Sequence, residues 1–164
     1  MKAGSTVKSP DELRGKVVVS TTGTTNLRVM RSLNEEKKLG IELLGAKDHA
    51  EAALLVQSGR AFAFAMDDIL LYGLKAGAAN PAELAVVGDA IQVEPYAIML
   101  RRDDPAFKKL VDDTLAALVR SGEFERLYRK WFQSPIPPKG VNLNAPMSRE
   151  LLDNLKNLSD KPAT

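Results

Sequence analysis

The chain has 164 residues, of which 45% are hydrophobic, enough for one ordinary domain or for the larger part of a two-lobed protein. Its 23 Lys and Arg residues against 21 Asp and Glu residues leave a net charge of +2, which argues against a protein that binds nucleic-acid phosphates over a broad surface. The absence of cysteine and the single histidine exclude cysteine-ligated metals, disulfides, thiol nucleophiles and multi-histidine metal centres.

The N-terminal half of the chain predicts alternating helices and strands. Ser9-Pro10-Asp11-Glu12 has the pattern of a capped helix start, and Gly15 ends that short helix. The apolar run 16–20 predicts a buried strand, and a helix follows from about Thr25 to Gly40 with Leu27, Met30 and Leu33 on its apolar side. This alternation continues as a strand over 41–44, a helix from Asp48 to Gln57, a strand over 61–65 and a helix from Asp67 through Leu74. We therefore expect an α/β fold with a mainly parallel sheet flanked by helices.

Helical spacing and turn residues give two further predictions for this region. In the helix that follows Asp48, the residues at helical spacing are Ala50, Ala53, Leu54 and Gln57. The stretch 77–81 predicts a loop, and 84–87 predicts another strand.

The pattern changes after Gly88. We expect a strand over 96–100, and Asp104-Pro105 predicts the start of a long helix that Gly122 ends. A shorter helix follows over 124–131, the proline-rich stretch 134–138 predicts an extended surface arm, and a final helix is expected from Ser148.

Polar residues follow each of the first three predicted strands. They form the clusters Thr21–Thr25, Lys47-Asp48-His49 and Asp67-Asp68. Because ligands of open α/β sheets bind beyond the carboxyl ends of the strands, these clusters predict a binding site.

Each cluster has a chemical and a purely structural interpretation. Gly23, Thr24 and Thr25 offer backbone N–H groups, hydroxyls and the positive end of a helix to a carboxylate or phosphate, although Thr24 or Thr25 could simply cap that helix. His49 could donate to an anion or be structural, and Asp67 could accept an ammonium group or serve the helix end. An anion site beside a cation site suits a zwitterionic ligand. Nucleophilic catalysis is not indicated, because no Ser or Thr has a recognisable activating base in the sequence.

The order of these segments resembles the second lobe of periplasmic solute-binding proteins for polar amino acids. The resemblance begins with Asp11 to Lys16 before the valine strand and continues through 22–25, through 58–61 leading to Met66-Asp67-Asp68, and through Gly122 to the sequence Lys130-Trp131-Phe132. The segments 46–49, 96–104 and 135–139 are similar to the glutamate/aspartate branch of that family. Phe62 departs from the family pattern, where many relatives carry an acid, and we interpret this as a change in strand packing.

The resemblance implies a role for each candidate residue. Thr24 and Thr25, with the backbone of Gly23, hold the ligand's side-chain carboxylate, and Thr22 lines the same pocket. His49 hydrogen-bonds that carboxylate, and Asp67 accepts the α-ammonium group. The resemblance implies no cofactor and no catalysis.

It also implies a type II periplasmic-binding-protein lobe whose N-terminal partner lobe is largely missing. On this view, 1–90 is the second lobe, 91–134 is the hinge-return strand with a helix pair that belongs to the first lobe, and 135–164 is an arm with a short C-terminal helix. The missing lobe, of about a hundred residues, supplies the groups that bind the α-carboxylate, so the chain holds half a site. The implied function is non-catalytic capture of glutamate or aspartate for the membrane permease subunits of an ABC importer, in the periplasm, although no signal peptide begins the chain.

Three other readings stay open. One is an enzyme of dehydratase type built on the same fold, with Asp48, Asp67 or Asp68 as the base. Another is the sensing module of a receptor, and a third is a truncated product without a function of its own.

We also expect a homodimer formed by segment exchange. In relatives an apolar face packs on the first lobe, and here that face lacks its partner. The residues of this face are Phe107, Leu110, Leu118, Phe124 and Trp131.

Overall fold

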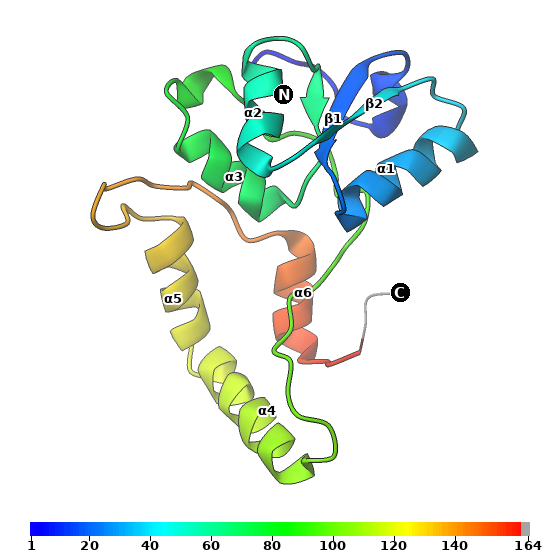
Figure 1. Cartoon of the computed structure of the whole chain (residues 1–164). Helices are drawn as coiled ribbons and strands as arrows, with labels where there is room; N and C mark the ends of the chain where they lie inside the picture. The colour runs from blue at the N-terminus through cyan, green and yellow to red at the C-terminus, as the bar shows by residue number, and fades with distance from the viewer. Residues whose placement is uncertain (162–164) are drawn as a thin grey trace. The chain divides into compact units, whose positions relative to one another are not determined.

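The computed structural model describes residues 1–161 and divides into two compact units, Met1–Gln92 (unit 1) and Val93–Thr164 (unit 2). Unit 1 contains the sheet, and the described part of unit 2 consists of helices and connecting segments (Figure 1). Within residues 1–161, no helix combines the length and the apolar character needed to cross a membrane.

Unit 1 is built on a parallel sheet, as predicted. Its strands are β1 (Val17–Thr21), β2 (Glu42–Ala46) and β3 (Ala63–Phe64), in the order β2-β1-β3, and both pairs are parallel. The third strand is shorter than the predicted 61–65, although Phe62 and Ala65 still donate their N–H groups to carbonyls of β1. The predicted burial of the valine strand is confirmed, because β1 has a neighbour on each side and Val18 and Val19 are fully buried.

Helices cover both faces of this sheet (Figure 1). They are α1 (Thr25–Glu36) on one face, and α2 (His49–Gln57) with α3 (Asp68–Ala76) on the other. Consecutive strand residues point to opposite faces, so Val18 packs in a cluster with Met30 of α1, whereas Val19 packs in a cluster with Ala52 of α2. The predicted layering on two faces is confirmed.

The buried side of α2 differs from the one suggested by helical spacing in the sequence. Leu54 is 61% exposed and Ala50 is also exposed, whereas Ala52 and Val56 are buried against the sheet. Both sets have helical spacing, so periodicity alone does not choose between them. The small side chain of Ala52 lets the helix approach β1 closely, which favours the observed face.

The remaining elements of unit 1 are short. The predicted first helix is a 3₁₀ turn, η1 (Pro10–Leu13), with the predicted capping box between Ser9 and Glu12. After the 3₁₀ turn η2 (Pro81–Glu83), the strand predicted over 84–87 is wrong: Leu84 forms a single antiparallel bridge with Lys2. Ala3 donates its N–H to the carbonyl of Glu83 at 2.7 Å and Ala85 donates to that of Met1 at 2.9 Å, so these two hydrogen bonds flank the single bridge.

The described part of unit 2 contains three helices, which begin where the sequence predicts. They are α4 (Pro105–Arg120), α5 (Glu123–Phe132) and α6 (Arg149–Asn157). Asp104 accepts the N–H of Phe107 at 3.1 Å, and Ser148 caps α6 in the same way. Gly122 separates α4 from α5 at a positive φ of 77°, as a left-handed position between helices requires.

Two predicted features of unit 2 are wrong. The segment 96–100 forms no strand, because within the described chain no neighbouring strand pairs with it, and Met99 is 97% exposed. The arm over 134–138 is not simply extended. It turns back on itself, since Ile136 donates to the carbonyl of Val141 at 2.9 Å and Gly140 donates to that of Ile136 at 2.8 Å.

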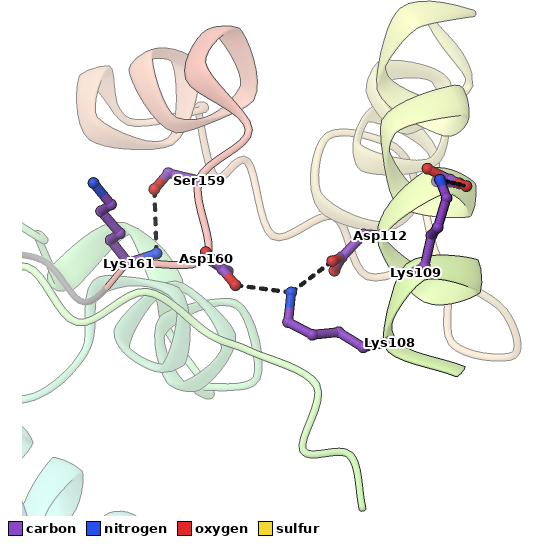
Figure 2. A network of polar contacts seen from close by, with 7 residues as sticks. Lys108, Lys109, Asp112, Ser159, Asp160 and Lys161 are labelled. Atoms are coloured by element: carbon purple, nitrogen blue, oxygen red, sulfur yellow. Dashed lines mark hydrogen bonds and ion pairs between the residues drawn. The ribbon is translucent and has the colours of Figure 1, made fainter. Parts of the chain in front are cut away.

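A polar network ties the end of the described chain to α4 (Figure 2). The Lys108 ammonium group bonds Asp112 at 2.6 Å, one turn further along α4, and Asp160 at 2.8 Å. These two carboxylates raise the pKa of Lys108 well above its ordinary value, and Lys108 in turn lowers the pKa of Asp160. The groups are solvent-exposed, so the network orients the chain end more than it stabilises the fold.

Candidate functional site

The three predicted polar clusters lie at one edge of the sheet of unit 1. The parallel strands β1, β2 and β3 lead directly into α1, α2 and α3, so their carboxyl ends meet at that edge. Hydrogen bonds join the first junction to each of the other two. The structure therefore brings the predicted residues together as a set.

The β1–α1 junction is built around Thr24. Its hydroxyl donates to the carbonyl of Thr21 at 2.7 Å and accepts the N–H of Leu27 at 3.3 Å, which makes Thr24 the N-cap of α1. The structural alternative raised from the sequence is thus correct for this hydroxyl, because its one hydrogen is already donated. Gly23 precedes it with a φ of 81°, a left-handed conformation that glycine adopts without strain.

The neighbouring threonines remain suited to an anion. Thr25 accepts a hydrogen bond from Arg28 at 3.4 Å, so its own hydrogen can be donated to a ligand. Thr22 is exposed, and its hydroxyl lies over Gly45 of β2, where a Cβ atom would come within 2.7 Å of it. The backbone N–H groups of the first turn of α1 add donors at the positive end of the helix.

His49 is the first residue of α2, and its ring lies near side chains of β1 and β3. Its Nδ1 atom lies 2.6 Å from the hydroxyl of Thr21, the last residue of β1. On another side, the Phe64 ring of β3 lies 6.5 Å from the imidazole, centroid to centroid, at 38°. Asp48 caps the same helix by accepting the N–H of Glu51 at 2.8 Å, so the two adjacent residues have separate roles.

The two acids before α3 are also distinct. Asp68 accepts the N–H of Ile69 at 2.7 Å, as a residue at a helix start does. The carboxylate of Asp67 makes no cap bond to α3 and instead accepts a hydrogen bond from the Asn26 amide of α1 at 2.9 Å. Of the two, Asp67 is therefore the acid directed toward the neighbouring junction. Burial and the charge of Asp68 together raise the pKa of Tyr72, which keeps that phenol neutral.

Sequence reasoning assigned no role to two residues that hold the site together. Thr21 orients His49, and Asn26 orients Asp67. The available signal was a polar residue closing an apolar strand in the first case, and an amide in the first turn of a helix in the second. Neither signal indicates the hydrogen-bond partner, which is 28 residues away in the sequence for Thr21 and 41 residues away for Asn26.

The arrangement offers hydrogen-bond donors and a carboxylate on one rim. The β1–α1 turn and His49 provide the donors, and Asp67 provides the carboxylate, as a zwitterionic ligand requires. Among residues 1–161, no three His, Cys, Asp or Glu side chains gather closely enough to hold a metal ion.

Comparison with known proteins finds close relatives over nearly the whole chain. It is 46% identical over 162 residues to the L-glutamate/L-aspartate-binding protein of Pseudomonas aeruginosa, covering 99% of this chain and 54% of that protein. It is 45% identical over 160 residues to the glutamate/aspartate import solute-binding protein of Escherichia coli K12, covering 98% of this chain and 53% of that protein. The chain thus spans about half the length of these relatives.

Solved structures agree on the fold. A probable amino-acid ABC transporter extracellular-binding protein, YtmK, from Bacillus subtilis matches with a TM-score of 0.69 at 20% identity, over 79% of this chain and 55% of that one. A mutant of the arginine-binding protein ArgBP from T. maritima matches with a TM-score of 0.62 at 26% identity, over 80% of this chain and 55% of that one. Residues 8–134 match the family described as bacterial extracellular solute-binding proteins, family 3. The chain therefore belongs to this family of non-catalytic solute-binding proteins.

Proposed function

We propose that this chain is part of the solute-binding component of an ABC importer for glutamate and aspartate. The observation that carries the proposal is the identity of 46% and 45% to two glutamate/aspartate-binding relatives over 99% and 98% of the chain. The zwitterion-compatible rim of unit 1 supports it independently, because that rim presents donors and a carboxylate from adjacent junctions.

In this proposal, the ligand's side-chain carboxylate binds at the β1–α1 junction. Thr22 and Thr25 donate through their hydroxyls, and Gly23 contributes its backbone. Thr24 contributes by shaping the turn, since its hydroxyl hydrogen goes to Thr21. His49 donates to the same carboxylate from α2, and Asp67 accepts the α-ammonium group.

The remainder of the site comes from residues outside this chain. Because the chain spans about half of its relatives, we propose that a second lobe binds the α-carboxylate and closes over the ligand. The closed form then engages the permease subunits of the importer, and we place this event in the periplasm. Because this chain supplies only half of the contacts to the ligand, we expect its affinity to be weak when it is by itself.

Calorimetric titration with glutamate and aspartate tests the proposal. It is carried out on this chain and on a chimera that adds the part of the Pseudomonas aeruginosa relative not covered here. We expect tight binding by the chimera, little by the chain alone, and a loss of at least about tenfold in the chimera carrying Asp67→Asn, since a charge-assisted bond is lost. Absence of binding to a folded chimera would contradict the assignment.

We further propose that the chain forms a homodimer by segment exchange. The apolar side of α4 and α5 includes Phe107, Leu110 and Trp131, of which Leu110 is 61% exposed. A second copy that exchanges this segment covers such a face. Sedimentation velocity should show a dimer that Leu110→Lys shifts toward monomer, with Lys109→Ala as the surface control. A compact monomer at high concentration contradicts this proposal.

A further inference from the structure

The contact between Thr21 and His49 joins the end of β1 to the start of α2. The distance of 2.6 Å between the hydroxyl oxygen and Nδ1 is that of a short, well-formed hydrogen bond. Thr21 is only 7% exposed, and the backbone of β1 fixes its position through pairing with Ala46 of β2. The hydroxyl is therefore a rigid partner for the imidazole ring.

The direction of this hydrogen bond follows from counting hydrogens. If Nδ1 carried the proton, the Thr21 hydroxyl would accept it, and its own hydrogen would need another acceptor inside the protein. Within residues 1–161, that hydroxyl forms its hydrogen bond with His49 and with no other group. A buried hydroxyl hydrogen without an acceptor is unfavourable, so the Thr21 hydroxyl donates to an unprotonated Nδ1.

The tautomer decides what the ring can offer a ligand. A neutral imidazole with a bare Nδ1 carries its hydrogen on Nε2. Nε2 is the nitrogen that Thr21 does not occupy, and the Phe64 ring packed near the imidazole limits rotation that would exchange the two nitrogens. The ring then presents an N–H donor, which a carboxylate needs, without requiring a positive charge.

We propose that Thr21 is a positioning residue that holds His49 in its Nε2–H tautomer, so that a neutral ring donates to the ligand's side-chain carboxylate. The ligand part of this inference rests on the proposed function. The tautomer part is a property of the unliganded chain and can be measured by itself.

The single histidine of the chain makes the measurement direct. Long-range ¹H–¹⁵N spectra of the uniformly labelled chain, in mildly alkaline buffer where imidazoles are neutral, report which ring nitrogen carries hydrogen. We expect protonated Nε2 and bare Nδ1 in the wild type and in Thr21→Ser, which keeps the hydroxyl. Thr21→Val keeps the shape and removes the hydroxyl, so it should give a mixture of tautomers.

The chimera described above then relates the tautomer to binding. Thr21→Val should weaken glutamate binding about fivefold, the effect of one hydrogen bond, and Thr21→Ser should restore most of it. A wild-type spectrum with protonated Nδ1, or an unchanged spectrum in Thr21→Val, would overturn the inference. If no protein bound glutamate, the proposed function would fail, and the spectra would still decide what Thr21 does to His49.

Discussion

Thr24 and Thr25 are neighbours in the sequence, yet their hydroxyl groups have different partners in the structure. Thr24 bonds the backbone on both sides of the turn, whereas Thr25 accepts a bond from the exposed Arg28 side chain. We expect Thr24→Ala to lower the free energy of unfolding of unit 1 by about 1 kcal/mol, because an N-cap is lost. Thr25→Ala should change it by less than about 0.5 kcal/mol and should instead weaken glutamate binding.

Urea unfolding and calorimetry on the chimera separate these two effects. Thr24→Ser is the control, since serine caps helices equally well and should preserve stability. Equal loss of stability in Thr24→Ala and Thr25→Ala would contradict the division of roles.

Two asparagines of α1 make a second contrast at the scale of single residues. Asn26 donates to Asp67 at 2.9 Å, whereas Asn34 exchanges two hydrogen bonds with the backbone of Ile41, at 3.0 and 2.9 Å. Asn34→Ala should therefore lower the unfolding free energy by about 2 kcal/mol and leave ligand affinity unchanged. Asn26→Ala should cost about 1 kcal/mol and also weaken glutamate binding severalfold, because the Asp67 carboxylate loses an orienting partner.

The readouts are again urea unfolding and glutamate titration of the chimera. Ser32→Ala, an exposed change on the same helix, should leave both values within about 0.5 kcal/mol of wild type. An affinity loss in Asn34→Ala as large as that in Asn26→Ala would show that general loosening of α1, and not the orientation of Asp67, is responsible.

At the scale of elements, helix starts were more predictable than strands. Asp48, Asp104 and Ser148 cap helices where the sequence indicates, because an N-cap depends on residues three positions apart. The segments 84–87 and 96–100 have strand-like composition, but no strand among residues 1–161 runs along them. A strand requires a partner that the local sequence does not specify.

The candidate site shows the same limit. The three junctions could be predicted because parallel strands place their carboxyl ends together. The bonds from Thr21 to His49 and from Asn26 to Asp67 could not, since each depends on the spacing between adjacent junctions. Thr24 was predicted as a ligand residue with capping as its alternative; its two hydrogen bonds show the cap, and its contact with a ligand stays a prediction.

Replacing either of two glycines of unit 1 by alanine should change the free energy of unfolding, in opposite directions. One glycine lies next to a helix and the other within one. A Cβ atom would meet no neighbour within 4 Å at Gly23 or at Gly73, so packing does not distinguish them. Gly73 lies inside α3, and Gly73→Ala should raise the unfolding free energy by about 0.5 to 1 kcal/mol. Gly23 has a φ of 81°, and Gly23→Ala should lower the unfolding free energy by about 1 kcal/mol through backbone strain. Thermal and urea unfolding check both signs, and stabilisation by Gly23→Ala would contradict the observed turn.

On the scale of the whole molecule, acid should affect unit 2 through a defined set of carboxylates. A bond from Arg101 and the N–H of Phe107 lower the pKa of Asp104. Arg126 lowers the pKa of Glu123, and Lys108 lowers that of Asp160. A carboxyl group whose pKa is lower in the folded state adds stability above its unfolded pKa and loses that contribution as the pH falls through its folded pKa.

We therefore expect unit 2 to lose stability as the pH falls below about 4, the ordinary range of these groups. Trp131, the single tryptophan of the chain, lies in α5, so its fluorescence during urea unfolding reports on unit 2. Asp104→Asn keeps a residue that caps helices but cannot titrate, and it should reduce the dependence of the midpoint on pH between about 4 and 2. High salt should reduce the same dependence, because these pairs are exposed and are screened. An identical pH dependence in wild type and Asp104→Asn would show that the Asp104 cap makes no contribution to acid sensitivity.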